Sequence, residues 1–302
     1  MKVAIILNGI SRKKKFFFCE ILPVLSKRKF EVDVFETKYP QHAFALAAHA
    51  DEEKFDCILA AVGDGTLNQV LNGMLSDNQN ENLFPALGII PLGTGNDFAR
   101  MCGIKPDANQ IADLLERNNP KLTDIGRIHC HDQQGKPLTK YFINVCSIGM
   151  GPEVVKRLMK SDRSLGPLLT YLKAITATFF THQSQAIEAR TPNWDWLGRM
   201  RVLAIANGQS FGNQMYIAPD ALPDDGLFST FVAGDLPLLK FLLCLQKVKD
   251  KRKINDRQIL YNECTSMEIT SPEPCAVEAE GEWMGWLPMK MEMLSKRVKF
   301  LR

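Results

Sequence analysis

Short apolar runs alternate with amphipathic stretches over roughly the first 125 residues. Unbroken apolar runs such as 57–62 and 86–90 are typical of parallel strands that are covered on both faces. Between the runs, apolar residues recur every three or four positions, as in helices with one buried side. We expect strands at 3–7, 31–35, 57–62 and 86–90, and helices at 14–28, 42–54, 67–74 and 107–117. This alternation predicts a doubly wound, mostly parallel α/β sheet in a first domain at 1–125.

From about residue 121 the pattern changes to short β-rich segments separated by turns such as 132–137 and 223–226. We expect strands at 122–131, 139–148, 184–191, 200–207, 227–232, 266–271, 274–279 and 289–293, and helices at 151–160, 165–180 and 236–249. Many short strands with turn signals favour a mainly antiparallel β-sandwich, here a second domain at 126–294. The tail at 295–302 is expected to pack back on the first domain.

Two glycine-containing turns follow the third and fourth expected strands. The first is Val62-Gly-Asp-Gly-Thr-Leu-Asn68, and the second contains Gly93-Thr-Gly-Asn-Asp97. A strand, a glycine turn and a helix start gather backbone N–H groups that can bind a phosphate. One such turn alone is weak evidence, because many turns of this kind only cap a helix and bind nothing. Two turns at the carboxyl edge of one sheet favour a phosphate-binding site, to which Asn8, Ser11 and Thr37 also belong by position.

The composition excludes several classes of protein. The 302 residues are 45% hydrophobic and 24% charged, as in soluble globular proteins, and the net charge of +3 gives no argument for nucleic-acid binding. The eight cysteines include no C-x-x-C pair, which indicates reduced thiols in a cytoplasmic protein. The sequence shows no signal peptide and no apolar run of the roughly 20 residues that a membrane-spanning helix needs.

The second turn continues as Asp97-Phe-Ala-Arg100, and the two turns together resemble the diacylglycerol kinase catalytic domain family. That family, which includes bacterial lipid kinases, sphingosine kinases and ceramide kinases, has turns that look like G-G-D-G-T-x-N and G-T-x-N-D-F-A-R. Val62 stands where the family usually has its first glycine, so we expect Gly63 and Gly65 to make the turn. Similar motifs are Thr123-Asp-Ile-Gly126, Asn207-Gly208, Ala218 to Gly226 and Glu280-Gly-Glu282, where Glu280 replaces an aspartate.

The resemblance implies a first domain like that of NAD kinases and phosphofructokinases, and it implies the site residues. The implied nucleotide-binding residues are Asn8, Gly9, Ile10, Ser11, Arg12, Thr37, Val62, Gly63, Asp64, Gly65, Thr66, Leu67, Asn68, Gly93, Thr94, Gly95 and Asn96. Glu282 is the implied general base, and Asp97 and Asp124 are further catalytic residues. Asp225 with the carbonyls of Leu222 and Leu227 would hold a structural Mg²⁺, and Asp64 a catalytic Mg²⁺.

The activity implied by the resemblance is an ATP- and Mg²⁺-dependent lipid kinase that contacts the inner face of the membrane from the cytoplasm. Diacylglycerol, giving phosphatidic acid, is the first acceptor to consider, while phosphatidylglycerol, a sphingoid base and ceramide stay open, as does a homodimer. Two alternatives remain. One is an NAD kinase-like enzyme, and the other is a non-catalytic nucleotide- or lipid-binding homologue, suggested by Val62, Glu280 and Gln69.

Overall fold

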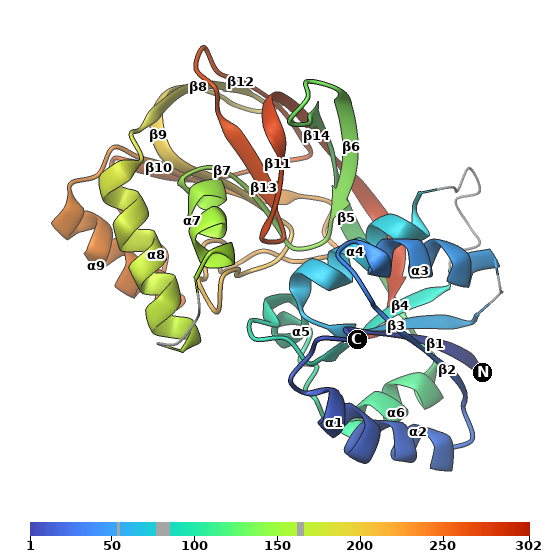
Figure 1. Cartoon of the computed structure of the whole chain (residues 1–302). Helices are drawn as coiled ribbons and strands as arrows, with labels where there is room; N and C mark the ends of the chain where they lie inside the picture. The colour runs from blue at the N-terminus through green and yellow to red at the C-terminus, as the bar shows by residue number, and fades with distance from the viewer. Residues whose placement is uncertain (53–54, 77–84, 162–165) are drawn as a thin grey trace. The chain divides into compact units, whose positions relative to one another are not determined.

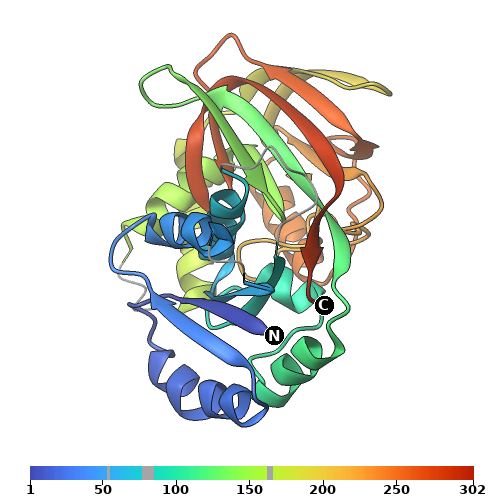
Figure 2. The same cartoon turned by 90° about the vertical axis from the view of Figure 1, so that its right-hand side faces the viewer.

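The computed structural model describes residues 1–52, 55–76, 85–161 and 166–302 (Figures 1 and 2). The described chain forms two compact units. The first consists of Met1–Thr123 and Lys296–Arg302, and the second of Asp124–Ser295. Each unit has its own hydrophobic core.

A parallel sheet forms the centre of the first unit. Its strands are β1 (Lys2–Leu7), β2 (Glu31–Glu36), β3 (Cys57–Val62) and β4 (Ala86–Pro91), in the order β4-β3-β1-β2. All three pairings among them are parallel. Every residue of β3 and β4 is buried, as the unbroken apolar runs predicted. At the free edge of β4, Phe300 pairs with Leu87, so the last residues of the chain extend this sheet.

Helices cover both faces of this sheet, which confirms the doubly wound arrangement (Figure 1). The helical elements are α1 (Lys14–Phe16), a π-helical turn η1 (Phe17–Ile21), α2 (Leu22–Lys27), α3 (His42–Glu52), α4 (Asp64–Met74), α5 (Asp97–Met101) and α6 (Ala108–Arg117). The region 14–28 was expected to be one regular α-helix. It contains a π-helical turn instead, because Pro23 has no N–H to donate and its ring crowds the preceding turn. The expected end of the next helix, Lys54, lies outside the described residues.

The second unit consists mainly of antiparallel strands. They are β5 (Lys121–His131), β6 (Pro137–Phe142), β7 (Val145–Gly149), β8 (Gln185–Arg190), β9 (Asp195–Ala206), β10 (Phe228–Gly234), β11 (Ile259–Cys264), β12 (Ser266–Thr270), β13 (Ala276–Ala279) and β14 (Glu282–Phe300). Six of them pair in a closed ring of the order β9-β7-β13-β14-β12-β8-β9. The antiparallel prediction is confirmed, but the strands form a barrel-like ring where two separate sheets were expected.

Two long strands close the ring. β9 pairs with β8 through residues 195–200 and with β7 through residues 202–206. β14 pairs with β13 through residues 282–286 and with β12 through residues 289–292. The alternation of apolar residues shows which face of a strand is buried, but it does not show which neighbours the strand has. For that reason the sequence could not distinguish a ring from a sandwich.

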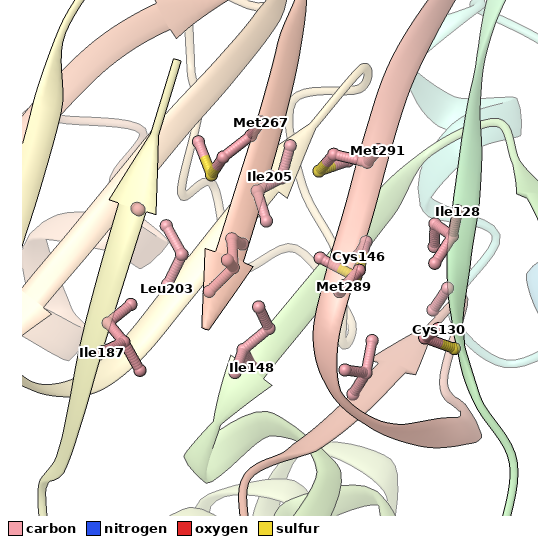
Figure 3. Close-up of a cluster of buried hydrophobic side chains, with 14 of the residues drawn as sticks. Ile128, Cys130, Cys146, Ile148, Ile187, Leu203, Ile205, Met267, Met289 and Met291 are labelled. Carbon is pink, nitrogen blue, oxygen red and sulfur yellow. The ribbon is translucent and has the colours of Figure 1, made fainter. Parts of the chain in front are cut away.

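The core of this unit consists mainly of aliphatic, methionine and cysteine side chains (Figure 3) and also contains Phe142 stacked on Phe228. Along β9 the side chains alternate: Leu203 and Ile205 lie in this core, whereas Ala204 and Ala206 lie in a second core outside the ring. The second core is covered by α7 (Met150–Met159), α8 (Pro167–Thr181) and α9 (Leu238–Lys249). Of the expected helix at 165–180, Leu165 lies outside the described residues, as does the side chain of Leu168.

None of the helices in the described parts of the chain combines the length and the apolar character required to cross a bilayer.

We predict that Gly73→Ala destabilises the first unit, although alanine is the better helix former by about 1 kcal/mol. A Cβ at Gly73 would lie 2.2 Å from the carbonyl oxygen of Phe44, so α3 and α4 would have to separate. Urea unfolding should show a loss of about 2 kcal/mol or more. Gly135→Ala is the control. A Cβ there would contact no other atom, and only the positive φ of 75° is unfavourable for alanine, which should lower the free energy of unfolding by about 1 kcal/mol. A Gly73 variant as stable as wild type would contradict the close contact.

Candidate functional site

The turns after β3 and β4 meet backbone to backbone. The N–H groups of Leu92 and Gly93 both donate to the carbonyl of Val62, at 3.0 and 3.1 Å. A Cβ at Gly93 would lie 2.4 Å from the Cα of Gly63, so the second turn tolerates no side chain at the contact, and a Cβ at Gly63 would be tight against Gly93, at 3.2 Å. Val62 is the last residue of β3 and Gly63 is extended, with φ −104°. Gly65, expected in the turn, lies inside α4 instead, because the helix begins directly at Asp64.

Asp64 connects the two turns through its carboxylate. Its oxygens accept hydrogen bonds from the N–H groups of Asp97, at 3.0 Å, and Phe98, at 3.2 Å, which are the first two residues of α5. Burial, and then the nearby charge of Asp97, raise the pKa of Asp64 to about 6. The Asp97 carboxylate pairs with the guanidinium of Arg100, which also donates to the carbonyl of Gly95 at 2.8 Å. Asp64 therefore caps α5 and holds the second turn in place.

Asn96 shapes the second turn and carries a buried acceptor. It adopts the left-handed conformation, with φ 53°, and its amide donates to the carbonyls of Gly93, at 2.9 Å, and Pro91, at 3.3 Å. Its side-chain oxygen, and that of Asn68 on α4, are buried without a hydrogen-bond partner among the described residues. Buried polar atoms of this kind are costly unless a ligand or water satisfies them. Both asparagines are among the residues that the motifs assign to the nucleotide.

The turns after β1 and β2 lie together at the same edge of the sheet. The N–H of Gly9 donates to the hydroxyl of Thr37 at 3.1 Å, and a Cβ at Gly9 would lie 2.2 Å from the Thr37 carbonyl oxygen. Asn8 accepts from the N–H of Ile10 at 3.1 Å, and the Ile10 side chain is exposed. The structure thus places Gly9 in contact with Thr37, with Asn8 directly before Gly9 in the chain, as their positions after strands 1 and 2 suggested.

A basic residue that the sequence analysis did not select reaches the second turn. The ammonium group of Lys13 lies 3.5 Å from the carbonyl oxygen of Gly93. Lys13 follows Ser11 and Arg12, which were selected, and its signal was the run of four basic residues at 12–15. Lys13 and Arg100 bring two positive charges to the second glycine turn.

In the second unit, Asp124 is fully buried and organises the turn at 223–226. Its N–H donates to the carbonyl of Pro223 at 2.8 Å, and its carboxylate accepts from the N–H of Gly226 at 2.6 Å and the hydroxyl of Ser295 at 3.2 Å. Asn207 donates to the Asp124 carbonyl at 2.9 Å. Asp124, Asn207 and the Asp-Asp-Gly turn, which are separate motifs in the sequence, thus form one hydrogen-bonded group.

Asp225 lies exposed in that turn, and its carboxylate accepts from the N–H of Leu227 at 3.0 Å. Desolvation raises the pKa of Asp225, and the negative charges of Asp124 and Glu263 raise it further. Negative charge near a carboxylate favours binding of a cation, and carboxylate and main-chain carbonyl oxygens are the ligands that Mg²⁺ prefers. The donor set expected here, Asp225 with the carbonyls of Leu222 and Leu227, fits a hard cation in its chemistry.

The Glu280-Gly-Glu282 motif forms the tight turn between β13 and β14. Glu280 and Gly281 have positive φ values of 57° and 75°, and Glu282 pairs with Ala279 at the first position of β14. The carboxylate of Glu280 accepts from the N–H groups of Ile143 and Asn144, at 3.0 and 2.6 Å. Glu280 therefore fixes this turn against the turn between β6 and β7, which leaves Glu282 at the beginning of its strand.

A buried carboxyl, missed by the sequence analysis, lies beside this turn. Glu278 is fully buried, and its carboxyl contacts the hydroxyl of Ser147 and accepts from the N–H of Gly281 at 3.0 Å. Burial raises the pKa of Glu278 to about 7. Its signal was a charged residue within the otherwise apolar expected strand at 274–279.

The structure thus brings the expected nucleotide-binding residues to one edge of the first unit's sheet. In the second unit it joins Asp124 to the turn that holds Asp225, and it places Glu282 in the separate turn after β13. Among the described residues there is no cluster of three or more His, Cys, Asp or Glu side chains that could hold a metal ion.

Two family models match the chain. The model of the diacylglycerol kinase catalytic domain matches residues 2–128, and that of the YegS C-terminal NAD kinase beta sandwich-like domain matches residues 145–302. Among curated proteins, the chain is 29% identical to a diacylglycerol kinase from Bacillus subtilis, over 99% of this chain and 95% of the relative. It is 26% identical to a Yersinia enterocolitica protein named "Probable lipid kinase YegS-like", over 87% of this chain and 81% of the relative.

The fold resembles that of solved kinases. The crystal structure of a diacylglycerol kinase from Bacillus anthracis matches with a TM-score of 0.72 and 20% identity, over 99% of this chain and 96% of that one. Yeast NADH kinase complexed with NADH matches with a TM-score of 0.54 and 10% identity, over 99% of this chain and 82% of that one. At these identities the likeness concerns the fold alone.

We predict that Glu278→Gln changes the pH dependence of stability. Because the folded protein keeps the Glu278 proton up to about pH 7 and an unfolded glutamate loses it near pH 4.5, the free energy of unfolding of wild type falls across this window. Glutamine has the same shape and does not titrate. The variant should therefore gain stability relative to wild type, by up to about 3 kcal/mol, between about pH 5 and pH 8. Urea unfolding of both proteins at pH 5 and pH 8 measures this. An equal difference in the free energy of unfolding between variant and wild type at the two pH values would contradict the prediction.

Proposed function

The chain belongs to the family that combines a diacylglycerol kinase catalytic domain with a YegS-type C-terminal domain, and we propose that it transfers the γ-phosphate of ATP to a lipid hydroxyl. Diacylglycerol is the proposed acceptor, since curated relatives along the whole chain bear the name diacylglycerol kinase. The observation that carries the proposal is the backbone contact between the two glycine turns, beside the buried, unpartnered oxygen of Asn96.

In the proposed nucleotide site, backbone N–H groups contact the phosphates more than side chains do. The first turn of α4 presents N–H groups that have no partner within the helix, and such groups at a helix N-terminus can bind phosphate oxygens. Lys13 and Arg100 add positive charge at the second turn. Phosphoryl transfer depends mainly on positioning and charge neutralisation, so these groups supply what the reaction needs from the protein. Asn8, Ser11, Arg12, Thr37, Thr66 and Thr94 are proposed as further contacts.

We propose two Mg²⁺ sites, one at the ATP phosphates and one in the second unit. When bound to the ATP phosphates, Mg²⁺ would neutralise negative charge, and Asp64 and Asp97 of the first unit are the carboxylates proposed to hold it, directly or through water. Asp124 is a proposed catalytic residue of the second unit. Asp64 also has a structural role, because its carboxylate accepts hydrogen bonds from the first residues of α5. A structural Mg²⁺ is proposed at Asp225 with the carbonyls of Leu222 and Leu227.

Glu282 is the proposed general base, which removes the proton from the lipid hydroxyl as that oxygen attacks the γ-phosphate. The turn that precedes it is fixed at Glu280 by two backbone N–H groups and at Gly281 by Glu278. This support holds the backbone of Glu282 in one position, as proton transfer requires.

The test of this proposal is incubation of the purified protein with ATP labelled in the γ-phosphate, Mg²⁺ and a total lipid extract, followed by identification of the labelled product. We expect labelled phosphatidic acid. Label in another phospholipid would replace diacylglycerol as the acceptor. A parallel reaction offers NAD⁺ in place of the lipid extract. Label transferred to NAD⁺ and not to lipid would establish the NAD kinase-like alternative, and bound ATP without any transfer would establish a non-catalytic homologue.

We predict that Glu282→Gln lowers transfer to lipid by about 10² to 10⁴, the usual contribution of a general base, with little change in ATP affinity. Glu280→Gln is the matched control. Its side-chain oxygen can still accept from Ile143 and Asn144, so activity should stay within about threefold of wild type. A Glu282 variant that keeps more than about a third of the activity would exclude this residue as the base.

For the structural metal, we predict that added Mg²⁺ raises the melting temperature of wild type and of Asp224→Ala, but not that of Asp225→Ala. A cation that binds only the folded protein stabilises it by an amount that rises with the logarithm of its concentration above the dissociation constant, and removal of the carboxylate removes that effect. Thermal unfolding at increasing Mg²⁺ concentrations measures it. Equal shifts in all three proteins would place the metal elsewhere.

A further inference from the structure

Helix α9 in the second unit has an exposed apolar face. Its buried side contributes Phe241, Cys244 and Val248 to the core outside the ring. On the other side, Leu239, Leu242 and Leu243 are 73%, 40% and 60% exposed. Positions three and four apart lie on one face of a helix, so the three leucines form one patch. A single exposed leucine needs no explanation, but three adjacent ones on one helix indicate a contact surface.

The end of α9 and the segment after it are strongly basic. Residues 247–253, Lys-Val-Lys-Asp-Lys-Arg-Lys, contain five basic residues and one acidic residue, which leaves a net charge of +4. Lys247 and Arg252 are exposed, and Lys253 pairs with Asp220 in an exposed ion pair. An apolar helix face followed by a basic cluster is the composition with which peripheral proteins bind anionic lipids: apolar side chains enter the interface, and cations contact the headgroups.

We propose that the leucine face of α9 and the basic segment 247–253 form the surface by which this protein docks on an anionic lipid bilayer. The inference deepens the proposed function, on which it rests for its biological purpose, since an enzyme that phosphorylates a bilayer lipid must reach the bilayer. A helix of 12 residues is too short to span a membrane, so α9 lies along the surface.

The charge of this surface argues against two other occupants. A second copy of the chain would bring one segment of net charge +4 against another of the same sign, which opposes association through this patch. Nucleic acid would satisfy the basic segment, but it gives no reason for three exposed leucines. An anionic bilayer is the partner that would contact both the exposed leucines and the basic segment.

The experiment is flotation of the full chain with vesicles, without ATP or diacylglycerol. Wild type should bind vesicles of phosphatidylcholine mixed with phosphatidylglycerol, and bind vesicles of phosphatidylcholine alone much more weakly. The double variant Leu239→Gln/Leu243→Gln and the double variant Lys247→Gln/Arg252→Gln should each lower binding at least about tenfold. Leu197→Gln is the matched control, because Leu197 is an 80% exposed leucine on β9, and it should bind as wild type does.

A second measurement separates docking from folding and from catalysis. All variants should keep the melting temperature of wild type and its activity on a water-soluble short-chain diacylglycerol. Vesicle binding that survives both double variants would overturn the proposal, as would an equal loss in Leu197→Gln. Concentration-dependent dimerisation that the leucine substitutions abolish would assign the patch to a second copy. If the wild-type protein transfers no phosphate but binds vesicles through α9, the proposed function is refuted and the docking surface is supported.

Discussion

The close approach of two backbone turns, at Gly63 and Gly93, is the constraint on which the first unit's candidate site depends. The turns are in contact because neither residue has a side chain there, and the Asp64 carboxylate then connects the first turn to the start of α5. This explains why glycine, aspartate and asparagine recur in both motifs. The glycines permit the contact between the turns, and the Asp64 carboxylate caps α5. Asn96, in the left-handed conformation, turns the chain between the second glycine turn and α5.

In the second unit, buried and half-buried carboxyl groups likewise hold turns. Asp124 accepts from Gly226, Glu280 from Ile143 and Asn144, and Glu278 from Gly281. Each of these bonds connects a carboxyl group to a backbone N–H group, an interaction that both fixes a loop and satisfies a charge away from water. Asp124 and Glu280, which the family motifs mark, therefore also position neighbouring turns, and loss of activity on their substitution does not by itself distinguish a catalytic role from a structural one.

The fold of the first unit could be predicted from the sequence almost completely, because strands buried on both faces give unbroken apolar runs. The second unit could be predicted less well. The strand Ile259–Cys264 was missed, the expected strand at 139–148 is two strands separated at Ile143 and Asn144, and Pro288 concealed the continuity of Glu282–Phe300. For the site, the glycine turns were visible as motifs. The roles of Lys13 and Glu278 were not, since they arise from contacts between segments distant in sequence.

If the two glycine turns bind the phosphates of ATP, nucleotide must protect their backbone N–H groups from exchange with solvent. Hydrogen–deuterium exchange of the full chain, with and without a non-hydrolysable ATP analogue and Mg²⁺, measures this protection. We expect slower exchange on nucleotide addition in the peptides that contain Gly63–Leu67 and Gly93–Asn96, and in the turn at Asn8–Ser11. Binding of the analogue with unchanged exchange in both glycine turns would contradict it.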